Sequence, residues 1–128
     1  MKRVLVDTHA FLWWLANDSA LGDFSKDLLR EPRNEVYVSA ASIWEISIKR
    51  RLGKLKAPSE IECIVEDEGF IGLPISLYHA RSAGQLPLIH RDPFDRMLVA
   101  QAQSEGLVIL TADPIFPEYG ISTLQANR

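Results

Sequence analysis

The sequence has few of the features that mark secreted, thiolate-metal or membrane proteins. It contains one cysteine, Cys63, which excludes an internal disulfide and a zinc site built from several cysteines. Its longest apolar runs, such as residues 10–16, fall well short of the ~20 residues that cross a bilayer. Residues 1–16 also lack the small-residue cleavage site of a signal peptide. We therefore expect a cytoplasmic protein without a membrane partner, in which Cys63 is a small buried hydrophobic residue rather than a nucleophile.

The sequence also lacks a large excess of positive or negative residues. The formal net charge of -3 neither attracts nor excludes nucleic acid. The basic residues are instead concentrated in residues 49–56 (KRRLGKLK), a pattern typical of a solvated helix end, where cations also suit the helix dipole. With 128 residues, of which 47% are apolar, the chain is long enough for one domain with its own core. We expect residues 1–128 to form that single domain.

Short apolar segments that alternate with helical patterns predict an α/β fold. Strands are expected over residues 4–6, 35–38, 69–75 and 107–110, with a weak one over 121–123. Helices are expected over residues 9–16, 25–30, 40–52, 58–68, 77–84 and 93–105, with Ser39, Ser76 and Asp92 as N-caps. This order predicts a three-layer α/β/α sandwich around a parallel sheet of four to five strands. Pro74 suggests that the strand over 69–75 lies at an edge of the sheet.

Four acidic residues fall at comparable places in this pattern. Asp7 directly follows the first strand and Asp113 comes just after the fourth. Glu45 and Asp95 lie in the first two turns of helices that begin at the same sheet edge. Ligands of open α/β sheets bind at that carboxyl edge, so the four carboxylates are expected to meet there.

Each acid taken singly has a structural explanation that stays open. Asp7 could cap a helix, and Glu45 could pair with Lys49 one turn later. Asp95, three residues after the cap residue Asp92, could close a capping box, and Asp113 before a proline could be a turn residue.

One further pattern favours a shared role. The predicted apolar arc of the helix over 40–52 consists of Ala40, Ala41, Trp44, Ile48 and Leu52, and it places Glu45 at its half-sheltered border.

Clustered carboxylates need a compensating charge. Two of them repel by about 4 kcal/mol at 4 Å in an effective dielectric of 20. Oxygen ligands without thiolate or paired histidine favour Mg²⁺ or Mn²⁺, and such an ion supports phosphodiester hydrolysis. Thr8 and Thr111 flank two of the acids, and their hydroxyl groups could either hold metal-bound water or serve the strand ends structurally.

These residues resemble the PIN-domain nucleases, and most closely the VapC-like toxin ribonucleases of bacterial toxin-antitoxin pairs. The similarity lies in Asp7-Thr8, in Ser39 followed six residues later by Glu45, in residues 95–100 and in residues 111–113. The longer stretches DTHAFLWWL, VSAASIWEISIKRRLGKL and HRDPFDRMLVAQA are similar to one subgroup of these toxins. Together the similar segments cover almost the whole chain in order.

The resemblance implies a PIN-like α/β/α fold and a Mg²⁺- or Mn²⁺-dependent endoribonuclease. It implies that the metal site and the catalytic site are formed by the same acids, Asp7, Glu45, Asp95 and Asp113, with Thr8, Ser39 and Thr111 around them. It also implies a homodimer that is neutralised by a small antitoxin, often of the Phd/YefM type in this subgroup. Asp92 is assigned to capping because Pro93 follows it.

Under this resemblance several further side chains gain expected roles toward RNA. The segment 49–56, beginning with Lys49, would contact phosphates, and Arg91 and Arg96 could clamp one. We interpret His90 as a hydrogen-bonding residue rather than an acid or base. Trp13 and Trp14 could stack on RNA bases, although helical spacing is more typical of core or dimer contacts.

Three other functions compete with the nuclease. An aspartate-nucleophile phosphatase also has an acid after its first strand, but it usually needs a second acid where this chain has His9. A receiver domain needs paired early acids and a lysine after its last strand. A catalytically inactive PIN-like module that binds RNA or protein is the more serious alternative, and loss of any of the four acids would have favoured it.

Overall fold

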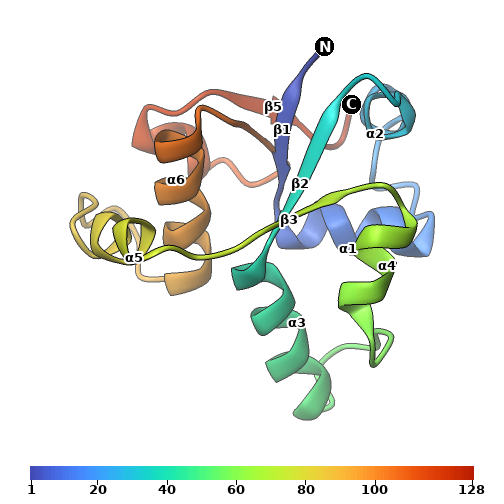
Figure 1. Cartoon of the computed structure of the whole chain (residues 1–128), viewed down its shortest axis with the longest axis horizontal. Coiled ribbons are helices and arrows are strands. Elements are labelled where there is room, and N and C mark those ends of the chain that lie inside the picture. The colour runs from blue at the N-terminus through green and yellow to red at the C-terminus, as the bar shows by residue number, and fades with distance from the viewer.

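A computed structural model describes all residues of the protein, Met1–Arg128, and it contains a parallel five-stranded sheet (Figure 1). The strands are β1 (Arg3–Val6), β2 (Glu35–Ser39), β3 (Ile71–Leu73), β4 (Val108–Thr111) and β5 (Thr123–Gln125). Their order is β3-β2-β1-β4-β5, and every neighbouring pair is parallel. The connections change direction between β1 and β4, which is where open sheets of this type bind ligands.

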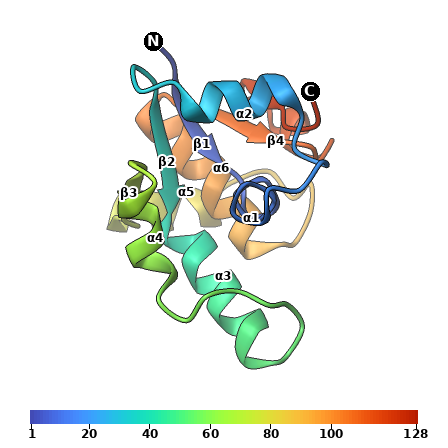
Figure 2. The ribbon, with the colours of Figure 1, turned by 90° about the vertical axis from the view of Figure 1, so that its right-hand side faces the viewer.

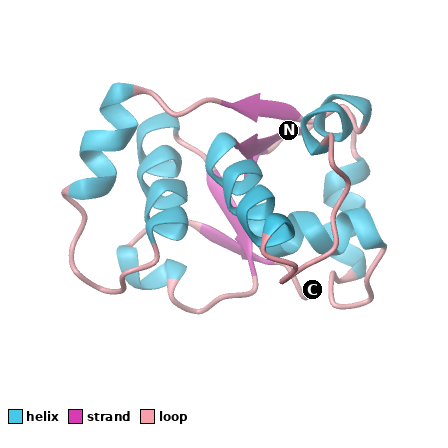
Figure 3. Ribbon diagram, turned by 90° about the horizontal axis from the view of Figure 1, so that it is seen from below, coloured by secondary structure: helices cyan, strands magenta, loops and turns pink.

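Helices cover both faces of the sheet. They are α1 (Thr8–Ala16), α2 (Asp23–Arg30), α3 (Ala40–Arg51), α4 (Ile61–Asp67), α5 (Leu77–Gly84) and α6 (Pro93–Glu105), followed by a 3-10 helix at Phe116–Tyr119. Helices α5 and α6 lie on one side of the strands and α1, α2 and α4 on the other, as Figures 1 and 3 show. Figure 2 shows α3 extending away from the end of the sheet. None of the helices is long and apolar enough to span a membrane.

The central strand β1 explains why the sheet has two cores. Its residues Val4, Leu5 and Val6 are fully buried, and successive side chains of a strand point to opposite faces. Val4 and Val6 pack in a cluster with Phe11 of α1, whereas Leu5 packs in a second cluster with Leu98 of α6. A short, wholly apolar strand is therefore buried on both faces, as the predicted three-layer sandwich requires. That prediction is confirmed.

The two helices that carry site acids, α3 with Glu45 and α6 with Asp95, begin at the predicted N-cap residues. The Ser39 hydroxyl accepts the N–H of Ala41 at the start of α3. Asp92 Oδ1 accepts the N–H groups of Phe94 and Asp95 at the start of α6. Because these side-chain bonds satisfy donors that the helix itself leaves unpaired, they fix where each helix begins. Both predicted caps are confirmed.

The sequence prediction was wrong about the segment around α4. The helix expected from Pro58 begins only at Ile61, after Glu60, which makes no side-chain cap. Cys63, expected to be buried, is exposed. The buried residues of α4 are Ile61 and Val65, one turn apart, and a residue two positions after Ile61 points to the opposite side of the helix.

The expected apolar arc of α3 is not its buried face. Trp44 and Leu52 are 62% and 63% exposed, and Ile48 is exposed as well. The helix instead packs through its small and polar face, whose buried residues are Ala41, Ser42, Glu45 and Ile46. This face lies against α1 and α6, the two helices that α3 contacts. Glu45 therefore lies within the buried face rather than at its border.

Candidate active site

Two of the acids lie at the carboxyl ends of neighbouring strands. Asp7 directly follows β1, and Asp113 follows β4 after one intervening residue. These strands pair in parallel, with Val6 opposite Leu110. The connection from β1 leads into α1, so Asp7 also caps that helix. Asp7 and Asp113 therefore lie at the point where the strand connections change direction, as the sequence predicted.

Asp7 is a buried and firmly held carboxylate. Its Oδ1 accepts the N–H of Ala10 at 2.8 Å, and its Oδ2 accepts the hydroxyl of Thr111. Burial raises the pKa of the Asp7 carboxyl, the bonds from Thr111 and Ala10 counteract this rise, and the charge of Asp113 adds to it. The capping explanation of Asp7 is thus confirmed, but a capping aspartate is normally solvated and this one is only 4% exposed.

Thr111 connects Asp7 to Asp113. Besides donating to Asp7, its hydroxyl accepts the N–H of Asp113 at 3.0 Å. Asp113 is exposed, and its Oδ1 accepts the N–H of Ile115, which confirms that it shapes a turn. One threonine hydroxyl therefore sets the relative positions of two strand-end acids.

Glu45 contributes a buried carboxylate from α3. Its Oε2 forms an ion pair with Lys49 Nζ at 2.7 Å, so the predicted pairing along the helix exists. The pair does not lie on an open surface, because the Glu45 side chain is 4% exposed. Its Oε1 is buried without any hydrogen-bond partner. A buried polar atom without a partner is costly, and in folded proteins such an atom calls for a specific explanation.

Lys49 places a positive charge among the acids. The hydrogen bond to Glu45 raises the pKa of the Lys49 ammonium, and the charges of Glu45, Asp92 and Asp95 add to this effect. The ammonium thus compensates part of the negative charge at this end of α3 and α6. Lys49, expected to contact RNA phosphate, is bound to Glu45 in this structure.

Asp95 has a strongly shifted carboxyl group. Burial, together with the charges of Asp92, Glu45 and Asp7, raises its pKa to about 6, while a hydrogen bond from His90 counteracts the rise. His90 Nε2 lies 3.4 Å from Asp95 Oδ2, and its Nδ1 lies 2.6 Å from the Tyr119 hydroxyl. Asp95 therefore contacts His90 instead of closing a capping box.

The four acids interact electrostatically. Asp113 acts on Asp7, and both Glu45 and Asp7 act on Asp95. Even so, no group of three or more histidine, cysteine, aspartate or glutamate side chains is arranged to hold a metal ion. The expectation that all four carboxylates share one cation stays a prediction.

Two of the three hydroxyl residues expected around the acids bond elsewhere. The Thr8 hydroxyl donates to Ser42 Oγ at 2.9 Å, which ties α1 to α3. The Ser39 hydroxyl donates to Gln101 Oε1 at 2.6 Å, which ties the end of β2 to α6. Both bonds are buried and serve packing between elements. Among these residues only Thr111 contacts the carboxylates.

Arg96 has a structural role in place of the expected phosphate contact. Its two terminal guanidinium nitrogens donate to carbonyl oxygens at the end of α5 and in the loop before α6, those of Ala83, Leu86, Pro87 and His90. These bonds occupy the donors that would form a fork around a phosphate. Arg91, by contrast, is exposed, and its expected phosphate contact stays a prediction.

The tryptophans of α1 pack on the core. Trp13 and Trp14 are half-buried against the cluster that contains Phe11, and the Trp14 ring lies 5.9 Å from the ring of Phe70. Of the two roles considered for them, core packing is confirmed.

Sequence reasoning missed three aromatic residues near the acids. Tyr119 supports His90, as described above. Trp44 and Phe94 lie edge to face with ring centroids 5.3 Å apart. Each of these two rings directly precedes an acid in the sequence, which is the signal that could have identified them.

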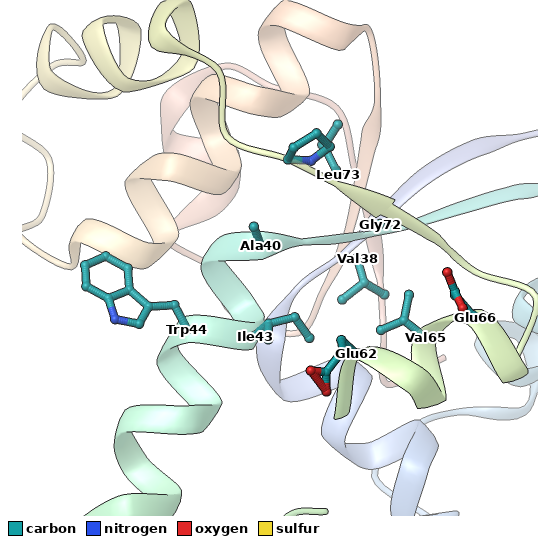
Figure 4. A pocket seen from close by; sticks show the side chains of 10 residues that line it. Val38, Ala40, Ile43, Trp44, Glu62, Val65, Glu66, Gly72 and Leu73 are labelled. Atoms are coloured by element: carbon teal, nitrogen blue, oxygen red, sulfur yellow. The ribbon is translucent and has the colours of Figure 1, made fainter. Parts of the chain in front are cut away.

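The protein also has two pockets beside α3. One, of about 500 Å³, lies between α3, α4 and β3 (Figure 4), and it is lined by Val38, Ala40, Ile43, Trp44, Glu62, Val65, Glu66, Gly72, Leu73 and Pro74. None of the four site acids lines it. The other, of about 370 Å³, is formed by the basic segment and lined by Arg50, Arg51, Leu55, Lys56 and Ala57.

Comparisons with known proteins agree with this fold. The chain is 39% identical over 61 residues to the ribonuclease VapC16 of Mycobacterium tuberculosis. That match covers 46% of this chain and 43% of the relative, so the chain spans less than half of the curated relative it matches.

Three solved structures share the fold over nearly all of the chain. The DNA-bound VapBC of Salmonella typhimurium has a TM-score of 0.71 at 20% identity, covering 97% of this chain and 98% of that one. VapBC2 of Rickettsia felis, bound to promoter DNA, has a TM-score of 0.70 at 13% identity, and the match covers 95% of this chain and 97% of that one. A toxin-antitoxin complex of Klebsiella pneumoniae has a TM-score of 0.64 at 16% identity, and the match covers 96% of this chain and 97% of that one.

The family comparison covers both the sheet and the acids. The model of the PIN domain family matches residues 4–121, a range that begins in β1 and includes Asp7, Glu45, Asp95 and Asp113. With the strand order, the position of the acids and this match in agreement, the chain belongs to the PIN domain family.

Proposed function

We propose that the protein is a metal-dependent endoribonuclease and the toxin of a toxin-antitoxin pair, with residues 1–128 as a single nuclease domain. The observation that carries the proposal is the buried Glu45 carboxylate, whose Oε1 has no partner and whose charge, with that of Asp7, adds to the rise in the pKa of Asp95. Such an arrangement is costly for folding alone and is typical of sites where charge is used.

The donor chemistry fits a hard divalent cation. The four acids offer oxygen atoms only, and the unpaired Glu45 Oε1 has no other partner in the fold. Asp7, Glu45, Asp95 and Asp113 are the residues that would hold Mg²⁺ or Mn²⁺. When bound, such an ion supplies charge stabilisation at the phosphodiester oxygens.

The surrounding residues orient the acids for this role. Ala10 and Thr111 fix both oxygens of Asp7, so its carboxylate cannot rotate freely. His90, itself held by Tyr119, lies against Asp95. Side chains that are held in place by their neighbours lose little entropy when substrate binds, which favours catalysis.

Positive charges on α3 and in the loop before α6 favour a polyanionic substrate. Lys49 lies at the acids, and together with Arg91 and the pocket of the basic segment 49–56 it would contact RNA phosphates and position the strand without reading its sequence. A catalytically inactive binding module is the less favoured alternative. A module that only binds has no need for buried, mutually repelling carboxylates held by hydrogen bonds.

We propose a small antitoxin as the protein partner. Support comes from the fold shared with the Klebsiella toxin-antitoxin complex and from the partial match to a VapC ribonuclease. In the subgroup that the sequence resembles, this antitoxin is often of the Phd/YefM type, and the toxin forms a homodimer.

Cleavage of RNA is expected to depend on added metal. The purified protein should cut RNA in Mg²⁺ or Mn²⁺, lose the activity in excess EDTA and recover it when the ion exceeds the chelator, because the acids need a cation to act on a phosphodiester. Gel analysis of end-labelled RNA measures this directly. Unchanged cleavage in EDTA, after contaminating nucleases are excluded with a mock purification, would contradict the proposal.

Expression without an antitoxin is expected to arrest growth. Colony counts should fall by orders of magnitude on induction and should recover when the neighbouring antitoxin is co-expressed. The control is the Asp7→Asn variant, which should be harmless at the same protein level. Normal growth in cells that contain soluble, active protein would refute the toxin assignment and leave the ribonuclease assignment standing.

A further inference from the structure

An exposed aromatic pair lies beside the site acids. Trp44 is 62% exposed, although indole is one of the largest apolar side chains. Its ring meets the half-buried Phe94 edge to face, with centroids 5.3 Å apart and planes at 78°. In Figure 4 the indole points away from Ile43 and Val65 and lies beside α6. The contact with Phe94 holds Trp44 while leaving most of its surface open to solvent.

The pair bridges the two helices that supply two of the acids. Trp44 directly precedes Glu45 on α3, and Phe94 directly precedes Asp95 on α6. Helices α3 and α6 contact each other, so the ring pair and the two carboxylates lie at one junction. The Lys49 ammonium, which compensates charge there, is partly exposed at the same junction.

We propose that Trp44 and Phe94 form a stacking platform for a nucleobase of single-stranded RNA next to the phosphodiester that is cut. The inference rests on the proposed ribonuclease function. Unstacked bases of single-stranded RNA pack on aromatic side chains, and this contact accepts any base because every base has a π-face. The Lys49 ammonium has three N–H donors and gives one of them to Glu45, so it can also donate to a phosphate. The junction thus offers one site for a base and one for the backbone.

An exposed tryptophan can also mark a protein interface, and Ile48 and Leu52 continue the exposed apolar line along α3. Two observations favour RNA for Trp44. Only Trp44 in this line is fixed by a second aromatic ring, and that ring, Phe94 of α6, directly precedes the acid Asp95. The other two residues are aliphatic and offer a base no π-face.

Binding can be measured separately from cleavage. Tryptophan fluorescence of the Asp7→Asn protein is titrated with a mixed-sequence single-stranded RNA decamer in Mg²⁺. The decamer is expected to quench the fluorescence, and adding Trp44→Ala should raise the Kd by about 5- to 100-fold, the effect of losing one stacked base. Trp44→Phe should restore binding to within a few fold, because phenylalanine keeps a π-face. Fluorescence anisotropy of a labelled decamer provides the same Kd for variants that lack Trp44.

Two controls separate stacking from a general loss of structure. Tyr78→Ala removes another exposed aromatic ring, on α5, and should leave the Kd unchanged. A decamer that is abasic at every position should bind equally to the proteins with and without the Trp44→Ala substitution, since it has no base to stack. With otherwise active protein, Trp44→Ala should raise KM for RNA far more than it lowers kcat. Thermal unfolding of each variant verifies the fold.

The outcomes distinguish this inference from the proposed function. Equal decamer affinity with and without Trp44→Ala, in a folded variant, overturns the stacking platform. So does a Trp44→Ala protein that binds and cuts RNA normally but loses self-association or antitoxin binding, because the ring would then serve a protein interface. If the parent chain itself neither binds nor cleaves RNA, the proposed function fails first.

Discussion

Replacing Asp7 by asparagine is expected to reduce RNA cleavage at least about 1,000-fold, because metal-assisted charge stabilisation is worth several kcal/mol and each 1.36 kcal/mol is a factor of ten. The fold should survive. Asparagine is as good an N-cap as aspartate, so its Oδ1 can still accept the N–H of Ala10. The substitution removes a charge whose burial raises the pKa of the carboxyl, but it also replaces the oxygen that accepts the Thr111 hydroxyl by an N–H donor. These effects oppose each other, so stability should stay close to that of the parent.

The measurement compares initial cleavage rates in saturating Mg²⁺ with thermal unfolding of the same preparations. Asp18→Asn is a matched control, since Asp18 also accepts a backbone N–H, that of Ala20, but lies on the exposed surface and does not affect the pKa of Asp7 or Asp95. Asp18→Asn should cleave normally. An Asp7→Asn protein that retains substantial activity would show that Asp7 does no more than cap α1.

Replacing Asp95 by asparagine is expected to abolish cleavage and, without metal, to stabilise the protein at neutral pH. The Asp95 pKa is raised from 3.8 to about 6, chiefly by burial and then by the charge of Asp92. Between these pH values the folded protein retains a proton that the unfolded chain has released. Stability therefore falls as pH rises through this window, by roughly 3 kcal/mol at most and by less where solvent screens the charge, and it stays lower above the window.

Asparagine carries no charge and does not titrate, so the variant should avoid this loss. In urea unfolding at pH 8 in EDTA, Asp95→Asn should be more stable than the parent, by about 1 to 3 kcal/mol. Near pH 3.5 the difference should largely disappear, because Asp95 is then mostly protonated in both states. Asp18→Asn again serves as control and should show no such pH-dependent gain. A variant that is less stable at pH 8 than the parent, but equal at acid pH, would mean that the ionised carboxylate stabilises the fold.

Both predictions describe a conflict between function and stability. Asp7 and Asp95 are carboxylates that burial and neighbouring charges make unfavourable, and the fold compensates them only in part through Thr111, His90 and Lys49. The unpaired Oε1 of Glu45 is the clearest remaining cost. Proteins commonly retain such costs where a charged site is needed for activity.

The sequence by itself determined the order of the strands and helices and where α3 and α6 begin, although it placed the start of α4 too early. Val4–Val6 is short, apolar and rich in β-branched residues, which predicts a strand buried on both faces, and the structure has one there. Ser39 and Asp92 had to start helices because their side chains can accept the first free N–H groups. Such signals are local, since the residues that cause them lie within a few positions of their effect. Alternation of strands and helices then required a parallel sheet, whose carboxyl edge receives Asp7 and Asp113.

Only the tertiary structure decided which face of each helix is buried and what each polar group contacts. Hydrophobicity placed Trp44 of α3 and the following Leu52 inside, but α3 packs through the face that carries Ser42 and Glu45, because that is the face that α1 and α6 contact. The same holds for Arg96, whose guanidinium group donates to carbonyl oxygens at the end of α5 and in the loop that follows it. Contacts of this kind join residues far apart in the chain, and they depend on the summed packing of several elements, which no local pattern encodes.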